Sequence, residues 1–260
     1  MDCQGGKDPK KDRNPIEKNL NRKNVLIFDM NVSDDYALRI LSLTTTQVPL
    51  LKEDVTDEIF YQVMCVLGKS QRFIDISRCM ELRPANFNQL SMCEALTYLD
   101  VSYTRIIDLS PIIENCFGIK AICLAGLDLA QHQYDNVGKL VNLEYLTLRQ
   151  SNINSINCCR YLYMLRSLNL GHTAITSISS LGGNNFTRLE ELVLDGCSNL
   201  NFDEFTDHLK NFCEIPNLAT LNICETDLLK GKDQIFDTHP NYNLSIESRS
   251  RRQVLLYIPL

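Results

Sequence analysis

Apolar residues recur along this chain in a short fixed pattern. Each copy has apolar residues at its first, fourth and sixth positions, and the clearest copies begin at Leu96, Ile119, Leu143, Leu165, Leu189 and Leu218. Alternation with a period of two is typical of a β-strand that buries one face. Each copy therefore predicts one short strand, with positions three, five and seven directed away from the core.

The spacing of the copies predicts a stack of similar units. Position four falls at Leu41, Ile74, Leu99, Ile122, Leu146, Leu168, Leu192 and Leu221, and a weaker ninth copy surrounds Leu244 and Ile246. Most successive copies lie about 20–29 residues apart, which is typical of repeat architectures. One unit cannot bury its apolar face alone, so neighbouring strands are expected to form one sheet.

These copies resemble the leucine-rich repeat, and the resemblance covers about residues 36–250. The short copy LRSLNLGHTAITSISSL is similar to the class found in phosphatase regulatory subunits. The longer LEELVLDGCSNLNFDEFTDHL is similar to the cysteine-containing class of ubiquitin-ligase substrate receptors. The resemblance implies an α/β leucine-rich-repeat solenoid of about eight to nine repeats. A parallel sheet would line its concave face, with short helices and turns on the convex face.

Two finer features follow from the repeat. Position nine, where asparagine is usual, carries Thr46, Cys79, Thr104, Leu127, Ser151, Thr173, Cys197 and Thr226. Hydroxyls and thiols can still donate a hydrogen bond to the turn, but Leu127 cannot, which predicts an irregular turn over residues 125–130. Convex helices are predicted over residues 55–67 behind Asp54, over 134–141 and over 205–212, while shorter repeats have room for one helical turn.

Composition favours a soluble globular chain, with 44% hydrophobic and 22% charged residues. The net charge of −6 and pI near 5.3 argue against a general nucleic-acid binder. No apolar run approaches the roughly 20 residues of a membrane span, and the N-terminus has no apolar signal core. We therefore expect an intracellular, cytoplasmic protein, with a nuclear or organellar location still open. Its eleven cysteines are expected to act mainly as small buried hydrophobic residues.

The sequence divides into three predicted segments. Residues 1–34 form a polar, basic N-terminal tail, residues 35–248 the solenoid, and residues 249–260 a C-terminal cap or tail. The basic cluster of Lys10, Lys11 and Arg13 leaves open a localisation signal or docking arm. The apolar end VLLYIPL either closes the last repeat or inserts into a partner.

Catalytic and metal-binding motifs are absent from the sequence. It contains no GxxxxGK[ST], GxSxG, HExxH or CxxC, and His132, His172, His208 and His239 are scattered. We therefore expect no enzymatic activity, no cofactor and no metal.

The outward positions predict a partner-binding surface in the N-terminal half of the sheet. Aromatic residues recur at position three, flanked by acidic, aromatic and basic residues: Phe73, Tyr98 and Tyr145, with Asp75, Asp100, Tyr103 and Arg149. Aromatic and arginine side chains ringed by polar groups are typical of interface hot spots. The two aspartates suggest a partner segment with Lys or Arg, and the small residues Ala121, Cys123 and Ala125 predict a shallow pocket.

The resulting prediction is a non-catalytic protein–protein interaction scaffold, a subunit of a larger intracellular hetero-complex that binds a protein through its concave face. We expect no small-molecule substrate, no membrane insertion and no nucleic-acid partner. Two alternatives stay open: a regulatory subunit of an enzyme such as a protein phosphatase, and a ubiquitin-ligase substrate receptor. The second rests on a faint similarity of residues 48–67 to an F-box helix, although the chain has no Trp to close that motif.

Overall fold

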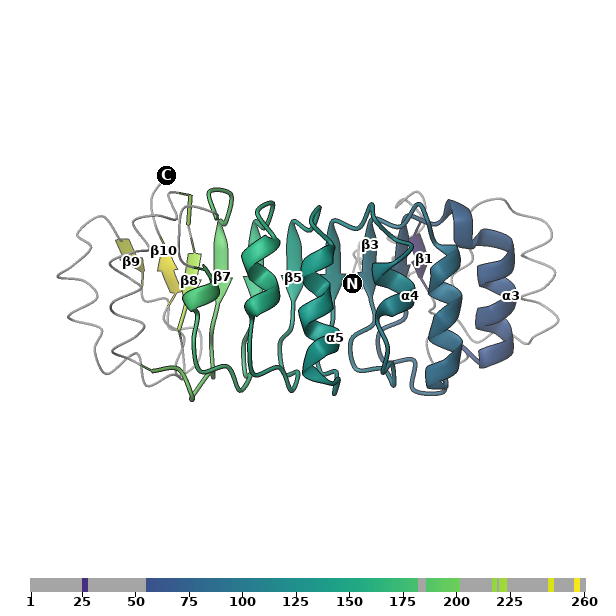
Figure 1. Ribbon diagram of the computed structural model, residues 1–260, viewed down its shortest axis with the longest axis horizontal. Helices are drawn as coiled ribbons and strands as arrows, with labels where there is room; N and C mark the ends of the chain where they lie inside the picture. Colours follow the sequence, from purple (N-terminus) through teal and green to yellow (C-terminus); the bar gives the residue numbers. More distant parts are fainter. Residues whose placement is uncertain are drawn as a thin grey trace, which may run out of the picture.

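The computed structural model describes residues 25–27, 55–181, 186–201, 217–218, 220–223, 243–245 and 255–257. Ten strands of three residues each form one sheet (Figure 1). Its first eight strands run parallel and in sequence order: β1 (Val25–Ile27), β2 (Phe73–Asp75), β3 (Tyr98–Asp100), β4 (Ala121–Cys123), β5 (Tyr145–Thr147), β6 (Ser167–Asn169), β7 (Glu191–Val193) and β8 (Thr220–Asn222).

The predicted register is confirmed from β2 to β8. Position four of each repeat pairs with position four of the next, in the order Ile74, Leu99, Ile122, Leu146, Leu168, Leu192 and Leu221. The buried residues of the described repeats form one continuous hydrophobic core. The chain is thus an α/β leucine-rich-repeat solenoid, in which each repeat buries its apolar face against its neighbours.

Both ends of the sheet differ from the repeat-based prediction. The strand beside β2 is β1, whereas the repeat order placed the copy around Leu41 there; that copy lies outside the described residues. The predicted ninth strand is present at Asn243–Ser245 (β9), but it pairs with β10 (Leu255–Tyr257) and not with β8. Strand β10 lies between them and is antiparallel to both. The segment limits of 1–34, 35–248 and 249–260 stay a prediction.

Helical segments and turns cover one face of the sheet (Figure 1). They are α3 (Asp57–Leu67), η2 (Gly68–Ser70), η3 (Pro84–Met92), α4 (Ser110–Ile113), α5 (Gln131–Asn136), η4 (Val137–Lys139), η5 (Asn157–Tyr161) and η6 (Ser179–Leu181). Among the described residues, no helix is both long and apolar enough to cross a membrane.

The convex helices confirm most of the sequence prediction. The helix expected over residues 55–67 is α3, which begins at Asp57. Its N-cap is Thr56, whose hydroxyl accepts a bond from the Ile59 N–H at 3.3 Å, and not the predicted Asp54, which lies outside the described residues. The helix expected over 134–141 is α5 continued by η4, and the short repeats carry only η5 and η6. The helix expected over 205–212 lies outside the described residues, while η3 and α4 were not predicted.

The turn after each strand repeats the same backbone geometry. Position eight has positive φ in six successive repeats, at Arg78, Tyr103, Gly126, Gln150, His172 and Gly196. This conformation is costly for residues other than glycine. In the stack it is supported by bonds between repeats: the Tyr103 N–H, for example, donates to the Ala125 carbonyl at 2.8 Å.

Position nine stabilises these turns as predicted. The hydroxyls of Thr104, Ser151 and Thr173 each donate to a backbone carbonyl three residues earlier, at 2.7 Å. The prediction of an irregular turn over residues 125–130 is wrong at Gly126, which adopts the same left-handed conformation as position eight of the other repeats. Leu127 is buried, and its carbonyl accepts a bond of 2.8 Å from the Tyr134 hydroxyl.

Candidate functional site

An interrupted row of aromatic side chains lies on the outward face of the sheet. Phe73, Tyr98, Ala121 and Tyr145 are paired neighbours on β2 to β5. Phe73 is 36% exposed and Tyr145 49%, while Tyr98 is half-buried. The Phe73 and Tyr98 ring centroids lie 6.1 Å apart, with the planes tilted by 31°. This separation is typical of a favourable aromatic pair.

The row is interrupted at Ala121, whose side chain is a single methyl group. Because neighbouring strands lie about 4.8 Å apart, the Tyr98 and Tyr145 backbones are separated by about 10 Å. Two residues further along β4, Cys123 is half-buried. Burial, and then the negative charge of Asp100, raises the pKa of the Cys123 thiol, so it stays neutral at physiological pH. The shallow pocket expected here stays a prediction.

Asp75 and Asp100 have a local structural role that sequence reasoning did not assign. The Asp75 Oδ1 accepts bonds from the Ser77 N–H at 3.0 Å and from its hydroxyl at 2.7 Å. The Asp100 Oδ1 accepts the same two bonds from Ser102, at 2.9 and 2.6 Å. Both carboxylates therefore hold the turn that leaves their strand. Their recognition of a basic partner segment stays a prediction.

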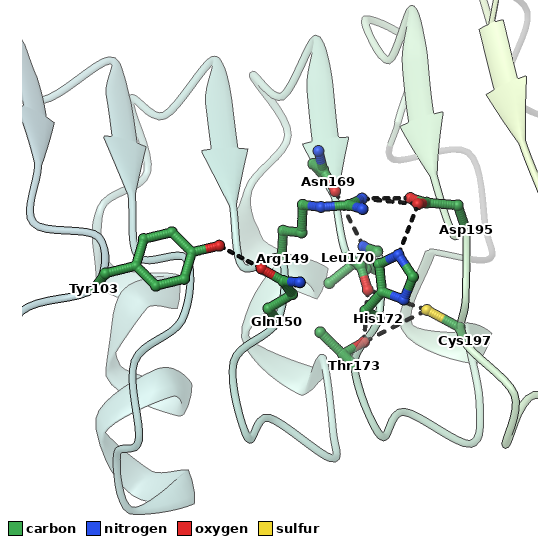
Figure 2. A network of polar contacts seen from close by, with 10 residues as sticks. Tyr103, Arg149, Gln150, Asn169, Leu170, His172, Thr173, Asp195 and Cys197 are labelled. Atoms are coloured by element: carbon green, nitrogen blue, oxygen red, sulfur yellow. Dashed lines mark hydrogen bonds and ion pairs between the residues drawn. The ribbon is translucent and has the colours of Figure 1, made fainter. Parts of the chain in front are cut away.

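Tyr103 lies in the turn after β3 and reaches along the carboxyl ends of the strands. The guanidinium carbon of Arg78 lies 4.7 Å from its ring centroid, within the range of a cation–π contact. The ring crosses Gly126, where an added Cβ would overlap it. Figure 2 shows the hydroxyl pointing to the Gln150 side chain, to whose Oε1 it donates a bond. Tyr103 and its contacts thus connect four successive repeats.

Arg149 makes a second connection across the repeats. Its Nη1 donates to Asp195 Oδ1 at 2.7 Å and Oδ2 at 2.8 Å, and the pair crosses Gly171 in the repeat between them. His172 adds its Nε2 at 3.2 Å from Asp195 Oδ2 (Figure 2). The Arg149 side chain is 32% exposed and that of Asp195 only 16%, so the pair is partly shielded from water. Arg149 is therefore held in one orientation at the rim of the outward face.

The structure divides the predicted site residues into two groups. Phe73, Tyr98 and Tyr145 form the aromatic row, whereas Tyr103 and Arg149 belong to the contacts at the carboxyl ends of the strands. Sequence reasoning missed the side chains that orient the second group, namely Arg78, Gln150, His172 and Asp195. The signal for them is positional, because three of the four occupy position eight. The two connections that they orient each cross a glycine of an intervening repeat, at position eight for Gly126 and at position seven for Gly171.

These groups can form apolar contacts, hydrogen bonds and ion pairs with another molecule. Among the described residues, no three His, Cys, Asp or Glu side chains lie close enough together to hold a metal ion.

No protein-family model and no curated protein matches the sequence. Similar solved structures include internalin C2 (20% identity, TM-score 0.43) and InlF (19%, 0.47), both from Listeria monocytogenes. A leucine-rich-repeat protein from Leptospira interrogans is 17% identical with a TM-score of 0.45. In the order given, the matches cover 52%, 62% and 62% of this chain, but only 62%, 52% and 38% of the length of the matched chains. The fold assignment rests on the repeat register described above.

Proposed function

We propose that this chain is a non-catalytic scaffold that binds a protein partner through the outward, concave face of its sheet, within a larger intracellular hetero-complex. The aromatic row carries the proposal. Phe73 and Tyr145 expose large apolar surfaces to solvent, and aromatic side chains dominate the energetics of protein interfaces. The intracellular location in this proposal rests on the sequence.

Preorganisation explains how such a surface would bind. Strands β2 to β5 are each paired on both sides, and their inward residues are buried in one core. The aromatic side chains consequently project from a rigid backbone, and Arg149 is already oriented by Asp195. Little conformational entropy is then lost when the partner binds. The partner would place an apolar side chain at Ala121 and polar groups along the rim near Arg149.

The similarity of residues 48–67 to an F-box helix receives no support from the packing. Ile59, Phe60, Val63 and Met64 of α3 are all buried in the solenoid core. A helix that uses its apolar face to hold its own repeat cannot offer that face to a ligase subunit. We therefore do not extend the proposal to a ubiquitin-ligase receptor.

The proposal is tested by affinity purification from native cells with quantitative mass spectrometry. The parent chain is compared with a Tyr98→Ala/Tyr145→Ala variant, and a Tyr61→Ala/Tyr161→Ala variant serves as the matched control. Tyr61 and Tyr161 are exposed but lie in α3 and η5, away from the aromatic row. We expect a stoichiometric partner to be lost only from the first variant, with both variants folded. Retention of every partner would place binding outside the concave face.

A further inference from the structure

The turns that precede the strands form a regular row at the amino ends of the sheet. In five successive repeats the residue at position one donates its N–H to the carbonyl three residues earlier, with N–O distances of 3.0 to 3.2 Å. These donors are Leu96, Ile119, Leu143, Leu165 and Leu189. The two residues between the donor and the acceptor of this bond form the tip of each turn. Because the turns share the bond, these two residues occupy equivalent places in every repeat. The first tip residues therefore line up from repeat to repeat.

Three of these tip residues are large, apolar and exposed. Phe117, Val141 and Tyr163 are 66%, 53% and 49% exposed, and we call them the edge stripe. The equivalent residues of the flanking repeats are polar, Glu94 on one side and Thr187 on the other. A contiguous apolar strip that is bordered by polar residues is typical of an interaction surface.

A row of charges runs beside the edge stripe, at position two of its three repeats and of the next repeat. Its members alternate in sign: Lys120, Glu144, Arg166 and Glu190, here called the charge ladder. Lys120 Nζ lies 2.8 Å from Glu144 Oε1, and Arg166 lies 3.4 Å from Glu144 Oε2 and 2.6 Å from Glu190 Oε1. The contacts hold the four side chains in order along the edge.

The order of these charges is self-complementary. Reversal of the ladder end to end places a negative group opposite every positive one: Lys120 opposite Glu190, and Glu144 opposite Arg166. A two-fold interface requires such a match, because both subunits contribute the same surface. We propose that two copies of this chain associate edge to edge through the edge stripe and the charge ladder.

The charges also select the register of the two copies. With the two-fold axis between β5 and β6, unlike charges meet along the whole ladder, and Val141 packs against Tyr163 of the second copy. A shift of the axis to β5 would instead place Lys120 opposite Arg166 of the second copy. Like charges in such contact are strongly unfavourable. An axis between β4 and β5 avoids them but within the ladder pairs only Lys120 with Glu144, so the first register alone pairs all four ladder charges with unlike ones.

The geometry leaves the aromatic row accessible in both copies. The two-fold axis runs from the convex to the concave side, so the two concave faces open in the same direction. Phe73 and Tyr145 lie on the outward face of the sheet and not in the turns that would be covered. The dimer does not depend on the proposed function, but it would present two partner sites side by side, and a partner with two matching segments would gain avidity.

The first test measures the mass of the purified full chain by sedimentation velocity over a wide concentration range. We expect a monomer–dimer equilibrium that shifts to monomer in Val141→Glu/Tyr163→Glu, with at least a tenfold rise in the dissociation constant. The matched control is Tyr61→Glu/Ile107→Glu, which alters two exposed apolar residues outside the edge stripe. A monomer at every concentration, or a dimer unchanged in the stripe variant, would overturn the proposal, even if another protein binds the stripe.

A charge reversal tests the register and the identity of the occupant. The variant Lys120→Glu/Glu144→Lys/Arg166→Glu/Glu190→Lys keeps alternating signs within one chain and remains complementary to itself. It should dimerise with its own kind but not with the wild-type chain, because like charges then meet across the interface. Native mass spectrometry of differently tagged chains measures this. Mixed dimers as abundant as like dimers would contradict the proposed interface.

Discussion

At the residue scale, small side chains decide which long ones can connect the repeats. Tyr103 crosses Gly126, and the Arg149–Asp195 pair crosses Gly171. Gly126 also has positive φ, so two separate requirements favour glycine there. Gly171 has no such backbone requirement, and only the ion pair above it restricts the residue at this position.

Gly171→Ala should therefore disrupt the Arg149–Asp195 contact without straining the backbone. We expect a loss of about 1 kcal/mol or less in the free energy of unfolding, because the pair is partly exposed. Denaturant unfolding measures this loss. Gly118→Ala is the control, since its added Cβ would lie 3.4 Å from the Leu96 carbonyl in ordinary contact. When Gly171→Ala is already present, adding Arg149→Ala should lower the free energy of unfolding only slightly further. If Arg149→Ala instead costs as much as it does in the wild type, the ion pair survives Gly171→Ala.

At the element scale, alternation within each strand separates structural from binding residues. Leu146 is 1% exposed and belongs to the continuous core, whereas Tyr145 beside it is directed to the outward face. A shift of the register by one residue would exchange these roles along the whole strand. The two faces of β3 and β5 therefore predict opposite responses to substitution.

Leu146→Asp should unfold the solenoid, because a carboxylate would be buried without a partner. Tyr98→Ala should cost about 0.5–1.5 kcal/mol for the lost aromatic pair with Phe73, in addition to the lost partial burial of its ring on the outward face. Thermal unfolding followed by circular dichroism compares the two variants. If Leu146→Asp unfolds at the wild-type temperature, or if Tyr98→Ala is unfolded, the assignment of the inward and outward faces is reversed.

At the scale of the whole molecule, the charge ladder connects four repeats along the edge of the sheet. Glu144 lies at its centre, in contact with both Lys120 and Arg166. The hydrogen bond from Lys120, together with the positive charges of Lys120, Arg166 and Arg188, lowers the pKa of the Glu144 carboxyl. A carboxyl whose pKa is lower in the folded than in the unfolded chain stabilises folding while it is ionised.

The contribution of Glu144 should therefore be present at neutral pH. It should be lost as the pH falls below the usual glutamate value of about 4.3 and through the lowered folded value. Glu144→Gln should reduce the free energy of unfolding at pH 7 by less than about 1 kcal/mol, as expected for a partly exposed pair. The difference from wild type should vanish in acid. Glu94→Gln, at a turn outside the ladder, is the control; equal losses of unfolding free energy in both variants would exclude a specific role of the ladder.

The sequence by itself determined the repeat, the strand register from Ile74 to Leu221 and most of the convex helices. It could do so because period-two burial and repeat spacing are local properties of the chain. It also placed Phe73, Tyr98 and Tyr145 on the outward face.

Only the tertiary structure decided which side chains meet. The neighbour of β2 is β1, β10 lies between β8 and β9, and Asp75 and Asp100 bind their own turns. The edge stripe and the bridges across Gly126 and Gly171 also come from the stack. These features depend on contacts between residues of different repeats. Such contacts form only when the repeats pack together and their equivalent positions align.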